Sequence, residues 1–210
     1  MSAGVEYLGF PLRLPVNKED HTEEEAAAII AGIKAPHKAI LITYLNKAEE
    51  IIEFCQELNC SFVQLHGDIS VGELQVLKQM EPSLVVFKSL VIGESTLSRL
   101  EEQISKLSPY VDAFITDTFD PAKGASGATG KVHDWSISRK FVEISPKPVI
   151  LAGGLNNSNV KEAILAVKPA GVDAHTGVEG TDGRKDSEMI KKFVSQTIEA
   201  FHVLDCQVYE

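Results

Sequence analysis

The chain has 210 residues, which is enough for one domain with a substantial core. Its formal net charge of −10 argues against nucleic-acid binding, and no apolar run is long enough to cross a membrane, so neither partner is expected. No basic and apolar leader opens the chain. The three cysteines, Cys55, Cys60 and Cys206, show neither a disulfide framework nor metal-ligand spacing, so we expect a cytoplasmic protein that binds no metal.

Short apolar runs alternate with helical segments along the chain, as in a series of βα units. The pattern predicts strands over residues 7–12, 39–44, 62–65, 84–88, 113–117, 149–152 and 171–174. Capping boxes at Thr22–Glu25 and Ser70–Glu73 mark the starts of two helices. Later helices are expected over 95–106, 136–144, 158–167 and 187–200. No Pro-, Gly- or Ser-rich linker divides the chain, so we expect a single domain over 1–210.

Two glycine-bearing turns follow the last two predicted strands, at 151–160 and 171–179. Glycines permit tight turns of any kind, but turns at strand ends can also present backbone N–H groups to an anion. In a (β/α)8 barrel, the loops after strands seven and eight are the usual phosphate site. Two such turns in succession therefore predict a phosphorylated small molecule as ligand. The irregular stretch 121–130 follows the strand that ends at Asp117, where barrel enzymes place active-site loops.

Several motifs follow one another along the chain: Val-Gln-Leu-His-Gly at 63–67, Asp117-Thr118, the stretch 127–135, Leu-Ala-Gly-Gly-Leu at 151–155 and Gly-Val-Asp at 171–173. In combination they resemble the phosphoribosylanthranilate isomerase family, over nearly the whole chain. The resemblance implies a TIM-type (β/α)8-like barrel, no cofactor, and an Amadori-type aldose–ketose isomerisation of a phosphorylated aminosugar in tryptophan biosynthesis. In that reaction a general acid protonates the ribose ring oxygen, and a general base removes the C2′ proton.

The resemblance also implies roles for individual residues. Asp117 matches the general acid of the family, although a carboxylate there could instead only cap the following loop. His66 is expected to line the site at its strand end, while Lys88 either serves the site or extends its amine to solvent. The phosphate-binding turns of the family are matched by Gly153, Gly154, Asp173, His175, Thr176 and Gly177.

The sequence departs from the family at three places, one of which is the last phosphate turn, where the family's paired serines are here His175 and Thr176. The family begins with a Lys-x-Cys-Gly strand whose cysteine is the general base, whereas residues 1–10 here match the second strand of the family. The family's arginine for the anthranilate carboxylate has no clear counterpart. Arg13 and Lys18 are the candidates for this role, although the neighbouring Glu19 and Asp20 would repel a carboxylate.

The tail at 202–209 has strand-like character, and a strand after the last helix would fall between strands eight and two of a barrel. We therefore hypothesise that residues 203–208 form a strand that replaces the first strand, and that Cys206 restores the general base. If the opposite face of this strand points inward, Asp205 takes that position. The alternative is a surface extension with an ordinary thiol.

Two functions stay open at this point. The chain is either an isomerase of this family or a catalytically altered or inactive paralogue that binds a phosphorylated metabolite. Asp117 with its glycine-rich loop favours the isomerase, and the missing base strand and arginine favour the paralogue. A third possibility is a phosphate-binding barrel enzyme of different chemistry. A recorded start that lies too late would also explain the missing strand. The protein is expected to be a monomer or a homodimer.

Overall fold

The computed structural model describes residues 4–15, 19–92, 97–120, 125–126 and 134–207. Its contacts divide the chain into two compact units: unit 1 comprises residues 1–4, 90–103 and 115–210, and unit 2 comprises residues 5–89 and 104–114. Each unit is described by itself below, and the expectation of a single domain stays a prediction.

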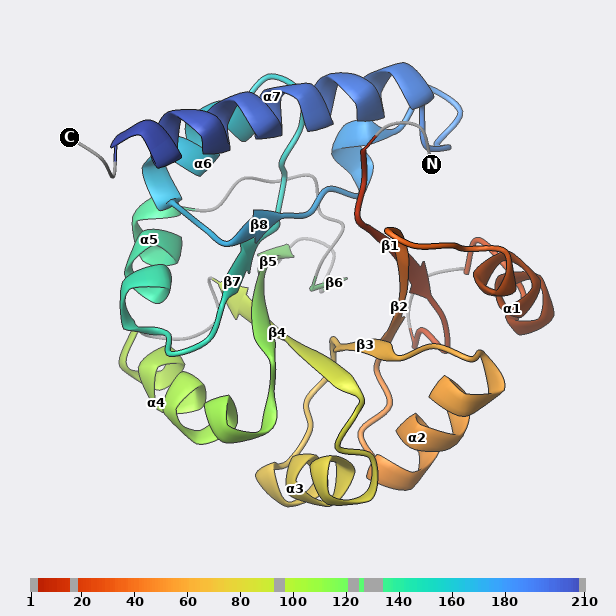
Figure 1. Ribbon diagram of the computed structural model, residues 1–210. Coiled ribbons are helices and arrows are strands. Elements are labelled where there is room, and N and C mark those ends of the chain that lie inside the picture. Colours follow the sequence, from red (N-terminus) through yellow and green to blue (C-terminus); the bar gives the residue numbers. More distant parts are fainter. Residues whose placement is uncertain (1–3, 16–18, 93–96, 121–124, 127–133, 208–210) are drawn as a thin grey trace. The chain divides into compact units, whose positions relative to one another are not determined.

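Unit 2 is built from alternating strands and helices, as the apolar runs predict (Figure 1). Its strands β1 to β4 pair in chain order and in parallel. The elements are β1 (Tyr7–Pro11), α1 (Glu23–Ala31), β2 (Lys38–Thr43), α2 (Ala48–Glu57), β3 (Phe62–Leu65), α3 (Val71–Met80), β4 (Val85–Ile92), the end of α4 (Leu97–Leu107) and a 3₁₀ turn (Ser108–Tyr110).

Two helices of unit 2, α1 and α3, begin where the capping signals predict. Thr22 accepts a hydrogen bond from the Glu25 N–H while the Glu25 side chain accepts one from the Thr22 N–H, which completes a capping box. Ser70 caps α3 in the same way, but the Glu73 carboxylate turns to the Ala48 N–H at the start of α2, 2.9 Å away. This second box is therefore incomplete, and its acidic residue joins two neighbouring helices instead.

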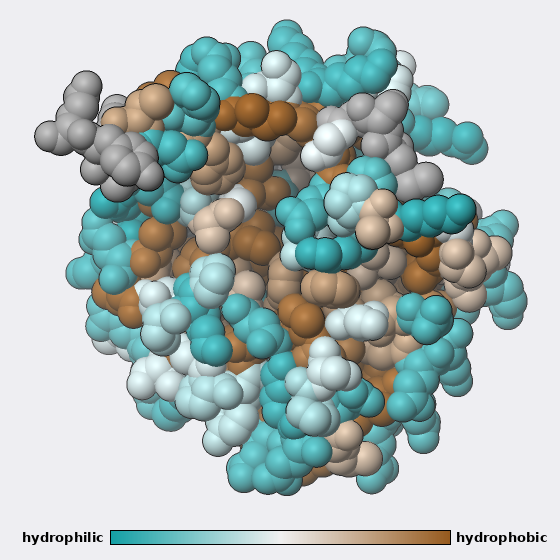
Figure 2. All heavy atoms as spheres, viewed as in Figure 1, coloured by the Kyte–Doolittle hydropathy of each residue, from teal (hydrophilic) through white to brown (hydrophobic). Residues whose placement is uncertain are grey.

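Unit 1 carries β5 (Ala113–Asp120) from Ile115 onward, β6 (Ala125–Ser126), α5 (Trp135–Ile144), β7 (Val149–Leu151), α6 (Val160–Val167), β8 (Gly171–Val172), a 3₁₀ turn (Thr176–Val178) and α7 (Ser187–Gln207). In the strand order β7 follows β5 and pairs in parallel with β8. One apolar cluster joins β7, α6, the 3₁₀ turn and α7, and its fully buried members include Leu151, Val160, Ile164 and Ala200. The outward faces of the helices are largely hydrophilic in the view of Figure 2.

The prediction of a C-terminal strand is wrong. Helix α7 continues without a break to Gln207, so residues 203–207 are helical, and α7 runs along α6 in Figure 1. The physical reason is the spacing of the apolar residues. Phe193, Ala200 and Leu204 recur at helical intervals, and all three belong to or pack against the apolar cluster. Packing of that stripe overrides the strand-like composition of the tail.

Candidate active site

Asp117 lies near the carboxyl end of β5 and is only 9% exposed. The preceding residue, Thr116, is fully buried and ties this strand to the end of β7. Its Oγ1 accepts a hydrogen bond from the Ala152 N–H at 3.0 Å and donates one to the Ala152 carbonyl at 3.2 Å. Because Ala152 directly precedes the glycine pair, Thr116 fixes the position of Asp117 relative to the first glycine turn.

The first glycine turn has the backbone conformation that only glycine adopts readily. Gly153 and Gly154 have φ values of 100° and 67°. The Gly154 carbonyl accepts hydrogen bonds from the side-chain amides of Asn159, at 3.0 Å, and Asn156, at 3.3 Å, which hold the turn. Within the described part of the chain, neither glycine N–H donates to a protein acceptor. Such N–H groups suit an anion.

Asp173 follows β8 and brings a second carboxyl group near Asp117. Its N–H donates to the Leu151 carbonyl at 2.9 Å, which continues the pairing of β8 with β7. Desolvation raises the pKa of Asp173 first and the nearby Asp117 carboxylate raises it further, while His175 and Lys185 lower it. Asp173 as a residue is nonetheless exposed to solvent, so it does not lie in the core.

The backbone of the second glycine turn packs closely against the backbone of the first. A Cβ at Gly177 would lie 1.8 Å from the Leu155 carbonyl oxygen, so no other residue fits there without a backbone shift. Lys185 Nζ lies 2.5 Å from Glu179 Oε1 and donates to the His175 carbonyl at 3.1 Å. His175 Nδ1 lies 3.2 Å from the same carboxylate oxygen but without hydrogen-bond alignment, so Lys185 is the main partner of Glu179. Thr176 begins the 3₁₀ turn between them.

Unit 2 carries a separate polar cluster at the ends of β3 and β4. Gln64 Nε2 donates to Ser89 Oγ at 3.1 Å, and Ser89 Oγ lies 3.1 Å from His66 Nδ1. The His66 ring also packs on Tyr44, with ring centroids 4.8 Å apart. Lys88 is 6% exposed, donates to the Ser89 carbonyl at 2.7 Å, and has its pKa lowered by burial to about 8. Lys88 therefore does not extend its amine to solvent.

The structure gives Arg13 partners of its own. Its guanidinium donates to both carboxylate oxygens of Glu23, at 2.9 and 3.0 Å, and to Glu57 at 3.4 Å. It also lies over the Phe54 ring, 3.6 Å from the centroid. The Glu23 hydrogen bond is the main cause that raises the pKa of Arg13. Since binding a substrate carboxylate would require Arg13 to leave these partners, we leave it out of the candidate site. Lys18, the other candidate, lies outside the described residues.

The hypothesis that Cys206 is the general base depended on a C-terminal strand, and this segment is helical instead. Cys206 is exposed in the last turn of α7, and its nearest polar contact there is His202 Nδ1, 3.7 Å from the sulfur. Asp205, the alternative on the opposite face of the expected strand, is exposed on the same turn. We therefore assign neither residue a catalytic role.

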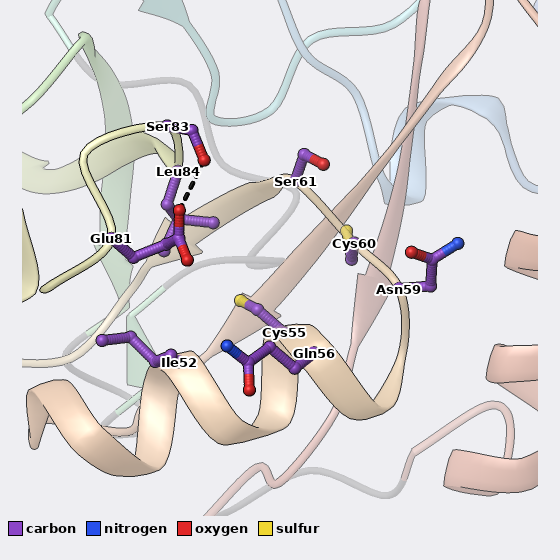
Figure 3. Close-up of a pocket in the computed structure, with 9 residues that line it drawn as sticks. All are labelled: Ile52, Cys55, Gln56, Asn59, Cys60, Ser61, Glu81, Ser83 and Leu84. Carbon is purple, nitrogen blue, oxygen red and sulfur yellow. Dashed lines mark hydrogen bonds between the residues drawn. The ribbon is translucent and has the colours of Figure 1, made fainter.

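A pocket of about 170 Å³ lies at the amino ends of β3 and β4 in unit 2 (Figure 3). Cys55 and Cys60 line it together with Ser61, which precedes β3, and Leu84, which precedes β4. Burial raises the pKa of Cys55 to about 12 and also raises that of Cys60, so both thiols are protonated and unreactive. Since ligands of parallel α/β sheets bind at the carboxyl ends of strands, this pocket is not the candidate site.

Sequence reasoning missed Thr116 and Ser89, although each leaves a signal. Both are small hydroxyl residues that follow a run of apolar residues within a strand and lie directly beside a charged residue. A buried hydroxyl must find a partner, so such positions predict a side-chain hydrogen bond across the sheet. The identity of the partner is not predictable from the sequence. The glycine-rich stretch 127–133, part of the family resemblance, lies outside the described residues.

The chain is similar to known proteins over most of its length. A model of the N-(5'phosphoribosyl)anthranilate (PRA) isomerase family matches residues 2–196. The chain is 38% identical over 193 residues to N-(5'-phosphoribosyl)anthranilate isomerase 2 of Methanosarcina mazei, which covers 91% of this chain and 84% of the relative. It is 33% identical over 195 residues to the N-(5'-phosphoribosyl)anthranilate isomerase of Haloferax volcanii, with 92% and 84% covered.

Solved structures are also similar to this chain. The phosphoribosyl anthranilate isomerase of Thermotoga maritima is similar with a TM-score of 0.78 and 26% identity, over 94% of this chain and 90% of that chain. The enzyme of Thermococcus kodakaraensis is similar with a TM-score of 0.72 and 27% identity, over 91% and 87%. These similarities confirm the predicted TIM-type fold class.

Across the described residues, no helix is both long and apolar enough to span a membrane.

Proposed function

Since this chain belongs to the N-(5′-phosphoribosyl)anthranilate isomerase family, we propose that it isomerises phosphoribosylanthranilate in tryptophan biosynthesis. The reaction is an Amadori-type aldose–ketose isomerisation, so the protein must supply an acid for the ring oxygen and a base for the C2′ proton. It must also hold the phosphate while the sugar ring opens. The described residues of unit 1 offer groups for two of these three tasks.

The observation that carries the proposal is the buried Asp117 beside the first glycine turn. Thr116 links this strand end to Ala152, so a carboxyl group and a pair of anion-binding N–H groups are held by one rigid connection. Asp117 is the proposed general acid. A phosphate on the N–H groups of Gly153 and Gly154 would anchor a sugar whose reacting atoms lie a few bonds away.

The second glycine turn is the proposed remainder of the phosphate site. Thr176 offers a hydroxyl donor, and Gly177 allows the backbone to approach closely. His175 offers an imidazole whose protonated form would attract a dianion. The raised pKa of Asp173 reduces the repulsion that a carboxylate would otherwise exert on a phosphate. The general base is not among the residues that this proposal assigns.

The test is a fluorescence assay for consumption of phosphoribosylanthranilate by the purified chain. We expect turnover, and we expect Asp117→Asn to lower kcat by about 10²- to 10⁴-fold, the range for loss of a general acid. Asp205→Asn is the matched control, because it makes the same change on an exposed turn of α7, and it is expected to keep full activity. Saturable binding of the phosphosugar without turnover would instead support the inactive paralogue.

We also propose that the protein works in the cytoplasm as a monomer or homodimer. The free, buried state of Cys55 and Cys60 suits a reducing compartment. A solved structure from Thermotoga maritima is of monomers generated from a dimeric phosphoribosylanthranilate isomerase, with 25% identity and a TM-score of 0.76 to this chain. Sedimentation equilibrium of the purified chain distinguishes the two oligomeric states.

A further inference from the structure

We propose that Asn159 is a positioning residue that keeps the first glycine turn in the conformation that binds phosphate. Its side chain bridges two backbone groups of this turn. Asn159 Nδ2 donates to the Gly154 carbonyl at 3.0 Å, and Asn159 Oδ1 accepts from the Asn156 N–H at 2.8 Å. The role in phosphate binding rests on the proposed function, whereas the bridge itself does not.

The two backbone partners fix the orientation of the Asn159 carboxamide. A carbonyl oxygen can only accept a hydrogen bond, and a backbone N–H can only donate one. The amide nitrogen must therefore face Gly154 and the amide oxygen must face Asn156. A flipped carboxamide would oppose two acceptors at one end and two donors at the other. The bridge thus closes in one way only.

Asn159 is also the N-cap of α6, a position where an asparagine ordinarily accepts a hydrogen bond from the first turn of the helix. Its side chain makes no such bond here. The carboxamide instead uses both its oxygen and its nitrogen on the glycine turn. Helix capping therefore does not account for this side chain, and the turn does.

The glycine pair needs such a constraint, because glycine adopts negative φ about as readily as positive φ. Gly153 and Gly154 have φ values of 100° and 67°, and their N–H groups have no backbone acceptor among the described residues. Rotation of the peptide group that carries the Gly154 carbonyl would have to break the bridge to Asn159. A turn that is ordered before the phosphate arrives loses less entropy on binding, so the bridge should tighten phosphate binding.

One other side chain contacts the same carbonyl. Asn156 Nδ2 donates to the Gly154 oxygen at 3.3 Å, which is a longer contact than that of Asn159. Asn156 Oδ1 accepts from the N–H and the hydroxyl of Ser158, at 2.8 and 2.6 Å. Loss of the Asn159 side chain would therefore leave the Gly154 carbonyl with only the longer of its two contacts.

Asn159→Ser separates the bridge from helix capping. Serine is an equally good N-cap and adds no charge, but its one oxygen ends a bond short of both amide atoms. By calorimetric titration we expect the Kd for inorganic phosphate to rise by about 3- to 10-fold, the scale of one neutral hydrogen bond. In the isomerase assay we expect KM for phosphoribosylanthranilate to rise by the same factor with kcat unchanged, since the lost interaction serves binding.

Asn157→Ser is the matched control, because it makes the same change two residues earlier in the same turn. Asn157 Oδ1 is buried and has no hydrogen-bond partner in the described part of the chain, so the bridge stays intact and Kd and KM should not change. Amide hydrogen exchange gives a readout that needs no phosphate. The Asn156 N–H should exchange faster in Asn159→Ser and at its original rate in Asn157→Ser.

Faster exchange at Asn156 with unchanged Kd and KM would overturn the proposal, since the bridge would then be structural only. Equal losses in Asn159→Ser and Asn157→Ser would also overturn it, as would an unchanged exchange rate or an unmodified chain that does not bind inorganic phosphate. If the unmodified chain binds phosphate but shows no turnover, the proposed isomerase activity fails, while the comparison of Kd values still decides the role of Asn159.

Discussion

Replacing Thr116 by valine tests the connection that holds Asp117 beside the first glycine turn. The substitution keeps the β-branched shape and exchanges a hydroxyl for a methyl group in a site with no exposure to solvent. It leaves the N–H and the carbonyl of Ala152 without the partners found at 3.0 and 3.2 Å. A buried polar group that loses its partner costs about 1–3 kcal/mol, so we expect a loss of about 2–4 kcal/mol in the free energy of unfolding.

Thr43→Val is the matched control for this measurement. Thr43 is also fully buried at the end of a parallel strand, but its hydroxyl accepts only one long hydrogen bond, from the Leu45 N–H at 3.4 Å. A contact of that length contributes little, so the expected loss is below about 1 kcal/mol. Both variants are measured by urea denaturation, with the chemical stability compared at equal m-values.

Native-state hydrogen exchange provides the local readout of the same prediction. The Ala152 N–H is protected by the Thr116 hydroxyl, so its exchange should accelerate in Thr116→Val more than the exchange of amides in the core of unit 1. Equal destabilisation by Thr116→Val and Thr43→Val, or an unchanged exchange rate at Ala152, would refute the reasoning that this hydroxyl holds the turn.

Three further predictions concern other parts of the chain. Gly177→Ala places a Cβ 1.8 Å from a backbone oxygen and should weaken both stability and phosphate-ligand affinity. Its control, Gly72→Ala, lies in the first turn of α3 with no atom closer than 3.8 Å, and should stabilise the protein by about 0.4–1 kcal/mol. Equal effects of the two variants in thermal unfolding and phosphate-ligand titrations would contradict the steric argument. Burial lowers the pKa of Lys88 from its ordinary 10.5 to about 8, so the folded chain releases this proton before the unfolded chain does. Between pH 8 and pH 10.5 the unmodified protein should therefore gain up to about 3 kcal/mol in stability relative to Lys88→Met, and a difference independent of pH excludes the shift. A thiol reagent at neutral pH should label only Cys206 in the folded chain and all three cysteines in denaturant, and labelling of Cys55 in the folded chain would contradict its burial.

The sequence predicts the repeated βα units well because their signals are local. Apolar runs locate the strands, and the Thr22 capping box starts α1 where the pattern places it. The Gly153–Gly154 pair is equally local, since positive φ values at two successive residues demand glycine. In each of these cases the physical cause lies within a few residues of the element that it predicts.

The tail shows where local patterns become ambiguous. Residues 203–208 are apolar at alternate positions, which suits a strand, yet Leu204 also follows Ala200 by four residues, which suits a helix. The neighbouring α6 decides between them, because a stripe that continues along α7 buries more apolar surface against the cluster of unit 1. Arg13 is a similar case, since only the folded chain brings Glu57, remote in sequence, to its guanidinium.

In unit 2, the buried side chains with hydroxyl or amide groups are placed unevenly along the strands, and their placement bears on function. Thr43, Gln64 and Ser89 lie in the carboxyl halves of β2, β3 and β4, and each is 8% exposed or less. The amino ends of β1 and β3 are aromatic, with the Tyr7 ring 5.6 Å from that of Phe62. Burying a hydroxyl or an amide costs stability unless its partners are arranged, so these three groups of unit 2 are not explained by filling a core alone. Such a group is explained where it contacts or holds a functional neighbour: in unit 2, Ser89 Oγ lies 3.1 Å from His66 Nδ1, and in unit 1, Thr116 holds the glycine turn next to Asp117.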